Sequence, residues 1–177
     1  MPHSTNILTT ARLKLRPLEQ ADSSAVFAMM SDSEAMRFWD WPAFAERETV
    51  DEIVAGQLAD VRAGDALYWA VCLGSGGPVI GICDLSAFDV HHRRAEIGFL
   101  FARAYWGQGY AREAMETIMA HAFGPLGLER LWARFHTGNM ASQNLLQKLG
   151  FAYEGTLKGH VLRDCERRDC EVWGRLR

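Results

Sequence analysis

Two glycines flank a glutamine immediately before a helical pattern, in the stretch YWGQGYAREA of residues 105–114. Glycine is costly to order and contributes no side chain, so Gly107 and Gly109 indicate a sharp bend or a close approach of the backbone to a ligand. The first turn of a helix leaves N–H groups without partners and carries partial positive charge. Together these features are typical of a cradle for phosphate, although a tight strand-to-helix turn can use the same glycines.

A carboxylate interrupts the apolar stretch AEIGFLF of residues 95–101. Because side chains alternate along a strand, Glu96 is expected on the sheet face opposite to Ile97 and Phe99. Partial burial there would raise its pKa. On the residues alone, Glu96 is a solvent-facing strand residue or the ion-pair partner of an arginine such as Arg94 or Arg134.

The elements that must position these residues follow one another without a repeat or a long linker. Alternating or β-rich runs predict strands, and apolar residues at helical spacing predict helices. Strands are predicted over residues 13–18, 66–73, 79–88, 95–101, 130–136, 151–157 and 170–176, and helices over 20–30, 46–62, 111–122 and 139–149. This order predicts one domain over residues 1–177, with a mixed α/β sheet and helices on its faces.

Composition narrows the class of protein. Hydrophobic residues make up 49% and charged residues 23% of the 177 residues, which is typical of a packed globular domain. The net charge of −3 provides no basic field for direct nucleic-acid binding. No apolar stretch has membrane-spanning length and no signal peptide is evident, so we expect a cytoplasmic protein without a membrane partner. The four cysteines have neither zinc nor disulfide spacing, so we expect free thiols and no metal.

Several motifs, taken in order, carry a resemblance to a known family: ARLKLRPL, EAMRFWDWP, WGQGYAREA, NMASQNLLQKLGF, then EG at 154–155 and RD at 168–169. The sequence resembles the GNAT superfamily of acyl-CoA-dependent N-acyltransferases and, within it, the RimJ/RimL type of ribosomal-protein N-terminal acetyltransferases. The resemblance implies the GNAT fold, in which a mostly antiparallel sheet splays between two strands, here 95–101 and 130–136. It also implies acetyl-CoA as co-substrate, an amine acceptor, no metal, and a monomer or homodimer.

The resemblance implies how coenzyme A is held. The glycine loop would bind its pyrophosphate through backbone N–H groups, while the pantetheine arm would pair with the free edge of the strand 95–101. Main-chain N–H groups near Leu100 and Phe101 would polarise the thioester carbonyl. Superfamily members often have Gln or Arg in place of Ala104, so that side-chain contact is expected to be missing here. The implied cofactor-binding residues are Phe99, Leu100, Phe101, Trp106, Gly107, Gln108, Gly109, Tyr110, Ala111, Asn139 and Ser142.

The resemblance also implies catalytic roles. Glu96 matches the strand position from which many GNAT enzymes present a glutamate to the acceptor amine, directly or through water. The usual tyrosine acid is replaced by Leu146, and Ser142, one turn earlier, resembles the serine given this role in RimL-type enzymes. A serine there can instead bond the backbone. Asn139 is a plausible helix N-cap and, by resemblance, contacts the pantetheine.

The resemblance implies that the acceptor pocket lies beside the aromatic stretch MRFWDWP of residues 36–42. Phe38, Trp39 and Trp41 either wall this pocket or close the core under a loop. The acceptor is expected to be a primary amine at a protein N-terminus or on an amino-acid-like molecule. The alternative function is a catalytically weak acyl-CoA-binding regulatory module, which the loss of tyrosine at Leu146 favours and Glu96 and Ser142 oppose.

Overall fold

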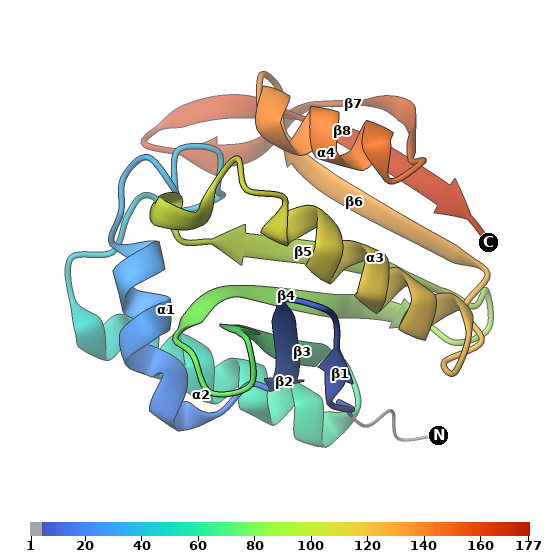
Figure 1. Cartoon of the computed structure of the whole chain (residues 1–177). Coiled ribbons are helices and arrows are strands. Elements are labelled where there is room, and N and C mark those ends of the chain that lie inside the picture. Colours follow the sequence, from blue (N-terminus) through green and yellow to red (C-terminus); the bar gives the residue numbers. More distant parts are fainter. Residues whose placement is uncertain (1–4) are drawn as a thin grey trace.

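An eight-stranded sheet in the order β1-β2-β3-β4-β5-β6-β8-β7 organises the chain (Figure 1). The computed structural model describes residues 5–177. The strands are β1 (Leu8–Thr9), β2 (Leu13–Pro17), β3 (Leu67–Leu73), β4 (Val79–Asp89), β5 (Arg94–Phe101), β6 (Arg130–His136), β7 (Ala152–Arg163) and β8 (Glu166–Leu176). The α-helices are α1 (Ser23–Met30), α2 (Arg47–Ala63), α3 (Tyr110–Phe123) and α4 (Met140–Lys148), with 3₁₀ turns η1 (Gln20–Asp22) and η2 (Arg103–Tyr105). The predicted mixed α/β sheet with helices on its faces is confirmed.

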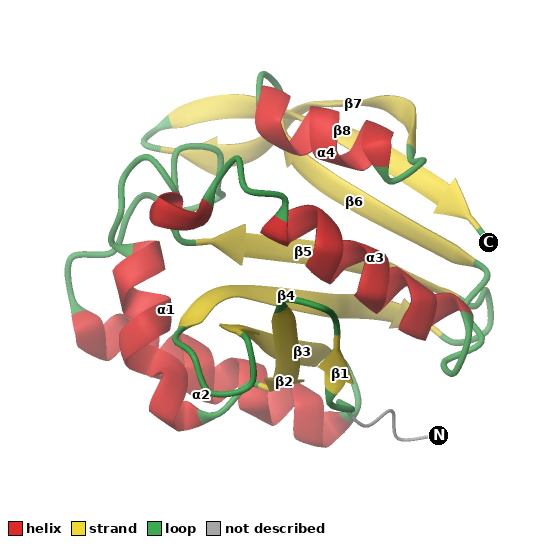
Figure 2. Cartoon of the chain, in the orientation of Figure 1, coloured by secondary structure: helices red, strands yellow, loops and turns green. Residues whose placement is uncertain are grey.

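The helices cover both faces of the sheet (Figure 2). α3 and α4 pack on one face, where a fully buried stripe of α3 that includes Met115 and Ile118 meets the inward residues of β3 to β6. α1 and α2 pack on the other face over Ala70, Ile82 and Leu100. Because successive strand side chains point to opposite faces, the two apolar sets come from alternate positions of the same strands.

The strands β5 and β6 hold the one parallel pairing of the described sheet, and it is short. Register partners run only from Arg94↔Arg130 to Glu96↔Trp132. β5 then continues to Phe101 beside β4, and β6 continues to His136 beside β8. The sheet therefore splays immediately after Glu96, between the two strands that the resemblance indicated.

The C-terminal part departs from the prediction. β7 and β8 pair up to Arg163↔Glu166, so the charged run of residues 160–168 belongs to the strands and their tight turn. The side chain of Arg163 is only 10% exposed, because it folds back onto the segment that follows α1. The sequence also gave no sign of the two-residue strand β1, and the helix predicted from residue 20 begins as a 3₁₀ turn.

All four cysteines are free, with Cys72, Cys83 and Cys170 buried and Cys165 exposed. In the part of the chain that the structure describes, no helix is long and apolar enough to cross a membrane.

Candidate active site

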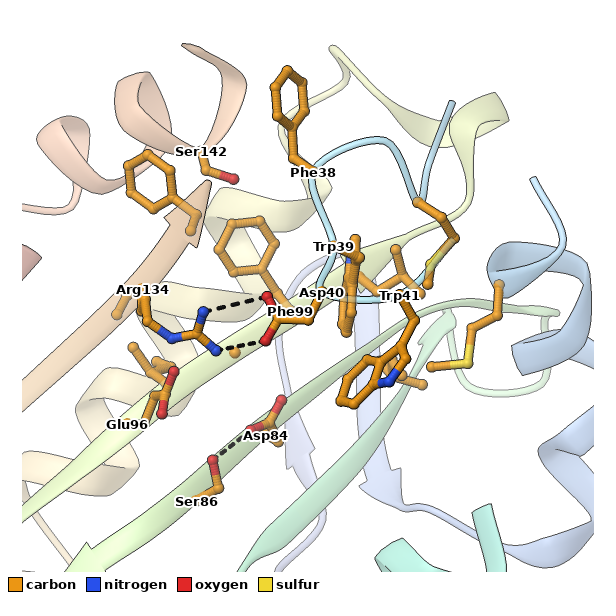
Figure 3. A pocket seen from close by; sticks show the side chains of 18 of the residues that line it. Phe38, Trp39, Asp40, Trp41, Asp84, Ser86, Glu96, Phe99, Arg134 and Ser142 are labelled. Atoms are coloured by element: carbon orange, nitrogen blue, oxygen red, sulfur yellow. Dashed lines mark hydrogen bonds and ion pairs between the residues drawn. The ribbon is translucent and has the colours of Figure 1, made fainter. Parts of the chain in front are cut away.

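A cavity of about 670 Å³ opens where the sheet splays and extends over the face of β3, β4 and β5 toward α2 (Figure 3). It brings together many residues that the sequence singled out: Phe38, Trp39, Trp41, Glu96, Phe99, Leu100, Asn139 and Ser142. The glycine loop and Phe101 are not part of its lining. The predicted site residues therefore divide into a cavity set and a loop set.

Glu96 lies in the cavity at the last position of β5 that pairs with β6. Its side chain has no hydrogen-bond or ion-pair partner among residues 5–177, since Arg94 pairs with Asp89 and Arg134 pairs with Asp40. Burial raises the pKa of Glu96 to about 7, the charge of Arg134 works against this rise, and the charges of Asp84 and Asp40 add to it. Neither ion-pair interpretation of Glu96 applies, and its carboxylate is placed to exchange a proton near neutral pH.

Asp84 is a second carboxylate in the cavity, and sequence reasoning missed it. It lies on β4 opposite Gly98 and accepts a hydrogen bond of 3.0 Å from the hydroxyl of Ser86. A Cβ at Gly98 would come within 2.3 Å of the Asp84 carboxylate, so glycine is what leaves room for it. Burial raises the pKa of Asp84 to about 6. The signal in the sequence was an acid between the apolar residues Cys83 and Leu85 of a β-rich run.

The aromatic segment of residues 36–41 forms a wall of the cavity and is held from the C-terminal half. Arg163 Nη1 donates to the carbonyls of Met36 and Trp39, each at 2.8 Å, and to that of Arg37 at 3.1 Å. Trp39 packs against the core under α1 and α2 and also lines the cavity. Trp41 is 59% exposed and lies at the rim.

Residues 106–109 form an exposed loop at the start of α3. Gly107 and Gly109 have left-handed φ values of 71° and 80°, which glycine adopts without strain. Gly109 is the N-cap, and no side chain among residues 5–177 caps the helix. The Gln108 side chain folds back and donates to the Ala104 carbonyl at 2.9 Å. The N-terminal N–H groups of α3 are therefore left for an outside partner, which fits an anion.

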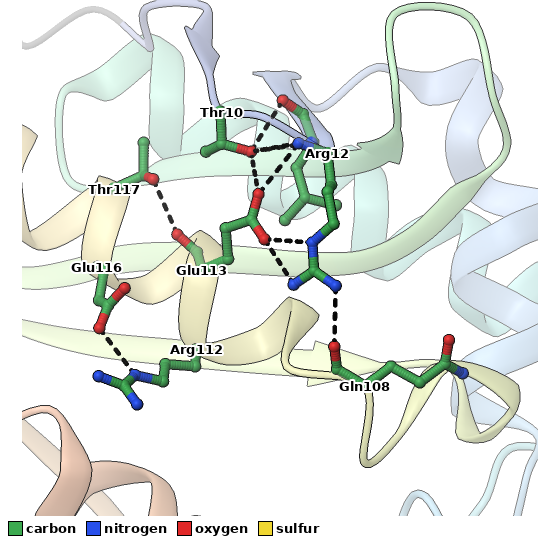
Figure 4. Close-up of polar contacts among 8 residues, drawn as sticks. Thr10, Arg12, Gln108, Arg112, Glu113, Glu116 and Thr117 are labelled. Carbon is green, nitrogen blue, oxygen red and sulfur yellow. Dashed lines mark hydrogen bonds and ion pairs between the residues drawn. The ribbon is translucent and has the colours of Figure 1, made fainter.

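The loop is tied to the N-terminal segment by Arg12 (Figure 4). Its guanidinium binds Glu113 on the first turn of α3, with Nε 2.7 Å from Oε2, and donates to the carbonyl of Gln108 at 3.0 Å. Thr10 donates to the other Glu113 oxygen at 2.5 Å. These contacts turn the carbonyl of Gln108 toward Arg12. No pattern in the sequence connected the N-terminal segment with the glycine loop.

The free edge of β5 supplies backbone groups beside the cavity. The N–H of Ala102 donates to Ile80 on β4, so alternation turns the N–H of Leu100 toward β4 and those of Phe99 and Phe101 toward the gap. The expected donor at Leu100 is thus corrected, while that at Phe101 has the required direction. Trp106 Nε1 donates to the Phe101 carbonyl at 2.8 Å and so ties the glycine loop to this edge.

The start of α4 lies across the gap. Asn139 is the N-cap, and its side-chain oxygen accepts from the N–H of Ser142 at 3.1 Å. The Ser142 hydroxyl has no hydrogen-bond partner among residues 5–177 and faces the cavity. Leu146, one turn further, is fully buried and has no proton to donate. Within the described residues, no group of three or more His, Cys, Asp or Glu side chains is arranged to hold a metal ion.

The family model of the acetyltransferase (GNAT) domain matches residues 12–152. The chain belongs to the GNAT acetyltransferase family. It is an N-acetyltransferase, and GNAT enzymes use acetyl-CoA as the acyl donor. The RimJ/RimL resemblance agrees with relatives and structural neighbours of this GNAT chain that include ribosomal-protein N-acetyltransferases.

Individual relatives span most of this GNAT chain. It is 30% identical over 167 residues to the uncharacterized N-acetyltransferase YoaA of Bacillus subtilis, with 94% of each chain covered. It is 29% identical over 148 residues to the spermidine N(1)-acetyltransferase of Escherichia coli, covering 82% of this chain and 75% of that one. The fold matches a solved structure of RimL, a ribosomal L7/L12 alpha-N-protein acetyltransferase, in complex with coenzyme A. That match has a TM-score of 0.86 at 19% identity, over 97% of this chain and 98% of the other.

The Glu96 carboxyl should titrate with a midpoint near 7, against about 4.3 for an ordinary glutamate. The measurement is a pH titration of the protein by ¹³C NMR of glutamate side-chain carboxyls, with Glu96→Gln to assign the signal. Asp84→Asn should lower the midpoint, because it removes a negative charge that disfavours the ionised form. A Glu96 midpoint below about 5 would contradict this description of the site.

Proposed function

We propose that this enzyme transfers the acetyl group of acetyl-CoA to a primary amine by direct attack of the amine, with Glu96 as the base. The observation that carries the proposal is the unpartnered Glu96 carboxylate at the point where β5 and β6 part. Its pKa of about 7 lets it be ionised before the reaction and still accept a proton at neutral pH.

The proton chemistry favours an α-amine. An α-amino group has a pKa of roughly 7.7–8.0, against about 10.4 for a lysine side chain. A carboxylate with a pKa of about 7 therefore nearly matches an α-ammonium ion but falls short of a lysine by more than three units. A protein N-terminus, or an amino-acid-like molecule, is the acceptor that this base serves best.

The remaining residues have supporting roles in the proposal. The thioester of acetyl-CoA supplies an activated acetyl group. The N–H of Phe101 is directed into the gap and can donate to a developing oxyanion, and the Ser142 hydroxyl can donate a hydrogen bond to a departing thiolate, which takes its proton from water. Residues 106–111 hold the pyrophosphate through the open N–H groups of α3, and Asn139 borders the pantetheine path. Phe38, Trp39 and Trp41 enclose the acceptor.

A polyamine is the second candidate acceptor. The cavity is lined by Asp60 and Asp84 as well as Glu96, while its arginine, Arg134, is neutralised by Asp40. This excess of acidic groups suits an acceptor with more than one positive charge. The similarity to spermidine N(1)-acetyltransferases supports the same reading.

Gly107→Asp should weaken coenzyme A binding about tenfold or more, because a negative charge would stand beside the pyrophosphate, and a tenfold loss corresponds to about 1.4 kcal/mol. Gly107→Asn is the matched control, with the same size and the same left-handed backbone but no charge. A Cβ at residue 107 meets no atom within 4 Å, whereas at residue 109 it would meet Arg12. Calorimetry measures the coenzyme A affinity of both variants. Equal affinities would contradict the placement of the pyrophosphate at this loop.

Glu96→Gln should lower kcat by roughly 10²-fold at neutral pH, because the amide cannot accept the acceptor's proton, and leave coenzyme A affinity unchanged. Thiol release from acetyl-CoA reports turnover and calorimetry reports binding. A decrease of less than about threefold would assign Glu96 to structure rather than to proton transfer. Coenzyme A binding by the unmodified protein, with no turnover of any amine, would instead favour the regulatory module.

An amine panel tests the acceptor. Peptides with a free N-terminus, or free amino acids, should be labelled by radioactive acetyl-CoA with higher kcat/KM than peptides whose only amine is an internal lysine. N-terminally blocked peptides and spermidine complete the panel. Preferential labelling of spermidine would make the polyamine the acceptor, and preferential labelling of internal lysine would contradict both candidates.

A further inference from the structure

Arg134 stands between two acidic groups but pairs with only one of them. It lies on β6, between the buried residues Ala133 and Phe135, and its side chain points into the cavity. Its guanidinium binds Asp40 through both terminal nitrogens, with Nη2–Oδ2 at 2.8 Å and Nη1–Oδ1 at 3.3 Å. Figure 3 shows Glu96 on the other side of Arg134 with no bond between them.

Asp40 is itself fixed from several sides. Its Oδ1 lies 3.0 Å from Nε2 of the buried His136, and the carbonyl of its neighbour Trp39 accepts from Arg163. Arg134 and His136 keep the pKa of Asp40 below its usual value even though burial opposes this. Asp40 therefore carries a full negative charge at neutral pH, and it is directed at the one cation of the described cavity lining.

We infer that Asp40 is a positioning residue for Glu96: by holding the Arg134 guanidinium it prevents an Arg134–Glu96 ion pair and so preserves Glu96 as a base. The inference rests on the proposed role of Glu96. Asp40 touches neither coenzyme A nor the attacking amine in this scheme, and it acts only through Arg134.

The titratable groups that face Glu96 decide what the loss of Asp40 would do. They are Arg134 from β6, Asp84 from β4, Asp40 from the aromatic segment, and Tyr68 from β3, which its raised pKa keeps uncharged. Arg134 alone is positive. If Asp40 lost its charge, Glu96 would be the carboxylate left to feel the charge of Arg134, and a paired Glu96 would be a weaker base.

The same pair joins the base to the acceptor wall. Asp40 lies between Trp39 and Trp41, so the ion pair that neutralises Arg134 also docks these side chains at the cavity. Displacement of this segment would release Arg134 at the same moment as it opened the wall. Glu96 would thus have its full basicity only while the wall is in place.

Three variants test the inference by the ¹³C carboxyl titration of Glu96 in the protein without ligand. Asp40→Asn should lower the Glu96 midpoint by about one pH unit or more, because it leaves a cation free beside the carboxylate. Arg134→Gln should raise the midpoint, because it removes that cation and leaves Asp40 charged. The double variant should lie between the two, since both charges are gone.

Arg163→Gln is the matched control. It removes the other anchor of the aromatic segment but leaves the Arg134–Asp40 pair intact, so the Glu96 midpoint should stay at its wild-type value. An unmoved midpoint in Asp40→Asn would overturn the inference. So would a double variant shifted as far down as the single one, because the shift would then come from displacement of the segment and not from the charge of Arg134.

Kinetics then separates this inference from the proposed function. With a short peptide bearing a free N-terminus as acceptor, the acid limb of kcat/KM should move to lower pH in Asp40→Asn together with the Glu96 midpoint. An acid limb that persists in Glu96→Gln would refute Glu96 as the base, whereas the NMR shifts would still decide whether Asp40 controls its ionisation. An acid limb that disappears in Glu96→Gln but does not move in Asp40→Asn would refute the positioning role alone.

Discussion

β5 and β6 pair over three register positions and then part, and the rest of the site depends on this break in the hydrogen-bonded ladder. A continued pairing would cover the edge of β5 with β6. Because the strands diverge, the N–H groups of Phe99 and Phe101 are left without a strand partner, and buried backbone groups must find one elsewhere. The divergence also opens the cavity beside Glu96. One feature of the sheet therefore creates both an edge for a ligand and a half-buried position for the base.

Charge in the cavity is arranged so that Arg134 is paired with a carboxylate, while Glu96 and Asp84 have no cation as partner within residues 5–177. Arg134 forms an ion pair with Asp40, while Glu96 has no partner among the described residues. Asp84 accepts a hydrogen bond from the Ser86 hydroxyl but has no cation beside it among the described residues. Burial of a carboxylate without a cation disfavours its ionised form, which places the pKa values of these two groups at about 7 and about 6. A nearby ammonium ion would stabilise the ionised form of both carboxylates, so the cavity is suited to receive an amine.

The glycine loop is shaped by parts of the chain far from it in sequence. Arg12 and Thr10 bind Glu113 on the first turn of α3, Arg12 also takes the Gln108 carbonyl, and the Trp106 indole binds Phe101. With these groups occupied, the loop presents N–H groups rather than carbonyls at the uncapped start of the helix. The cradle and the open edge of β5 are thus parts of one connected arrangement.

The sequence by itself determined most of the helices and strands and, within them, which side chains share a face. Alternation put Glu96 opposite to Ile97 and Phe99, helical spacing gave the buried stripe of α3, and the glycines marked the turn before it, because these are properties of a few neighbouring residues. Asn139 as N-cap is a local property of the same kind. The order and spacing of the motifs carried the resemblance to the GNAT family, and that resemblance implied that the sheet splays between β5 and β6.

Tertiary structure alone decided how the charges are shared. From the sequence, Glu96 could have been the ion-pair partner of Arg94 or of Arg134. Only the packing of residues 36–41 against β6 brings Asp40 to Arg134, 94 positions away in the sequence. Asp84 became part of the site because β4 and β5 pair in a register that sets it against Gly98, where the missing Cβ makes room. The pairing of distant charges and the solvent around a carboxylate depend on how the whole chain packs, and no local pattern of residues encodes them.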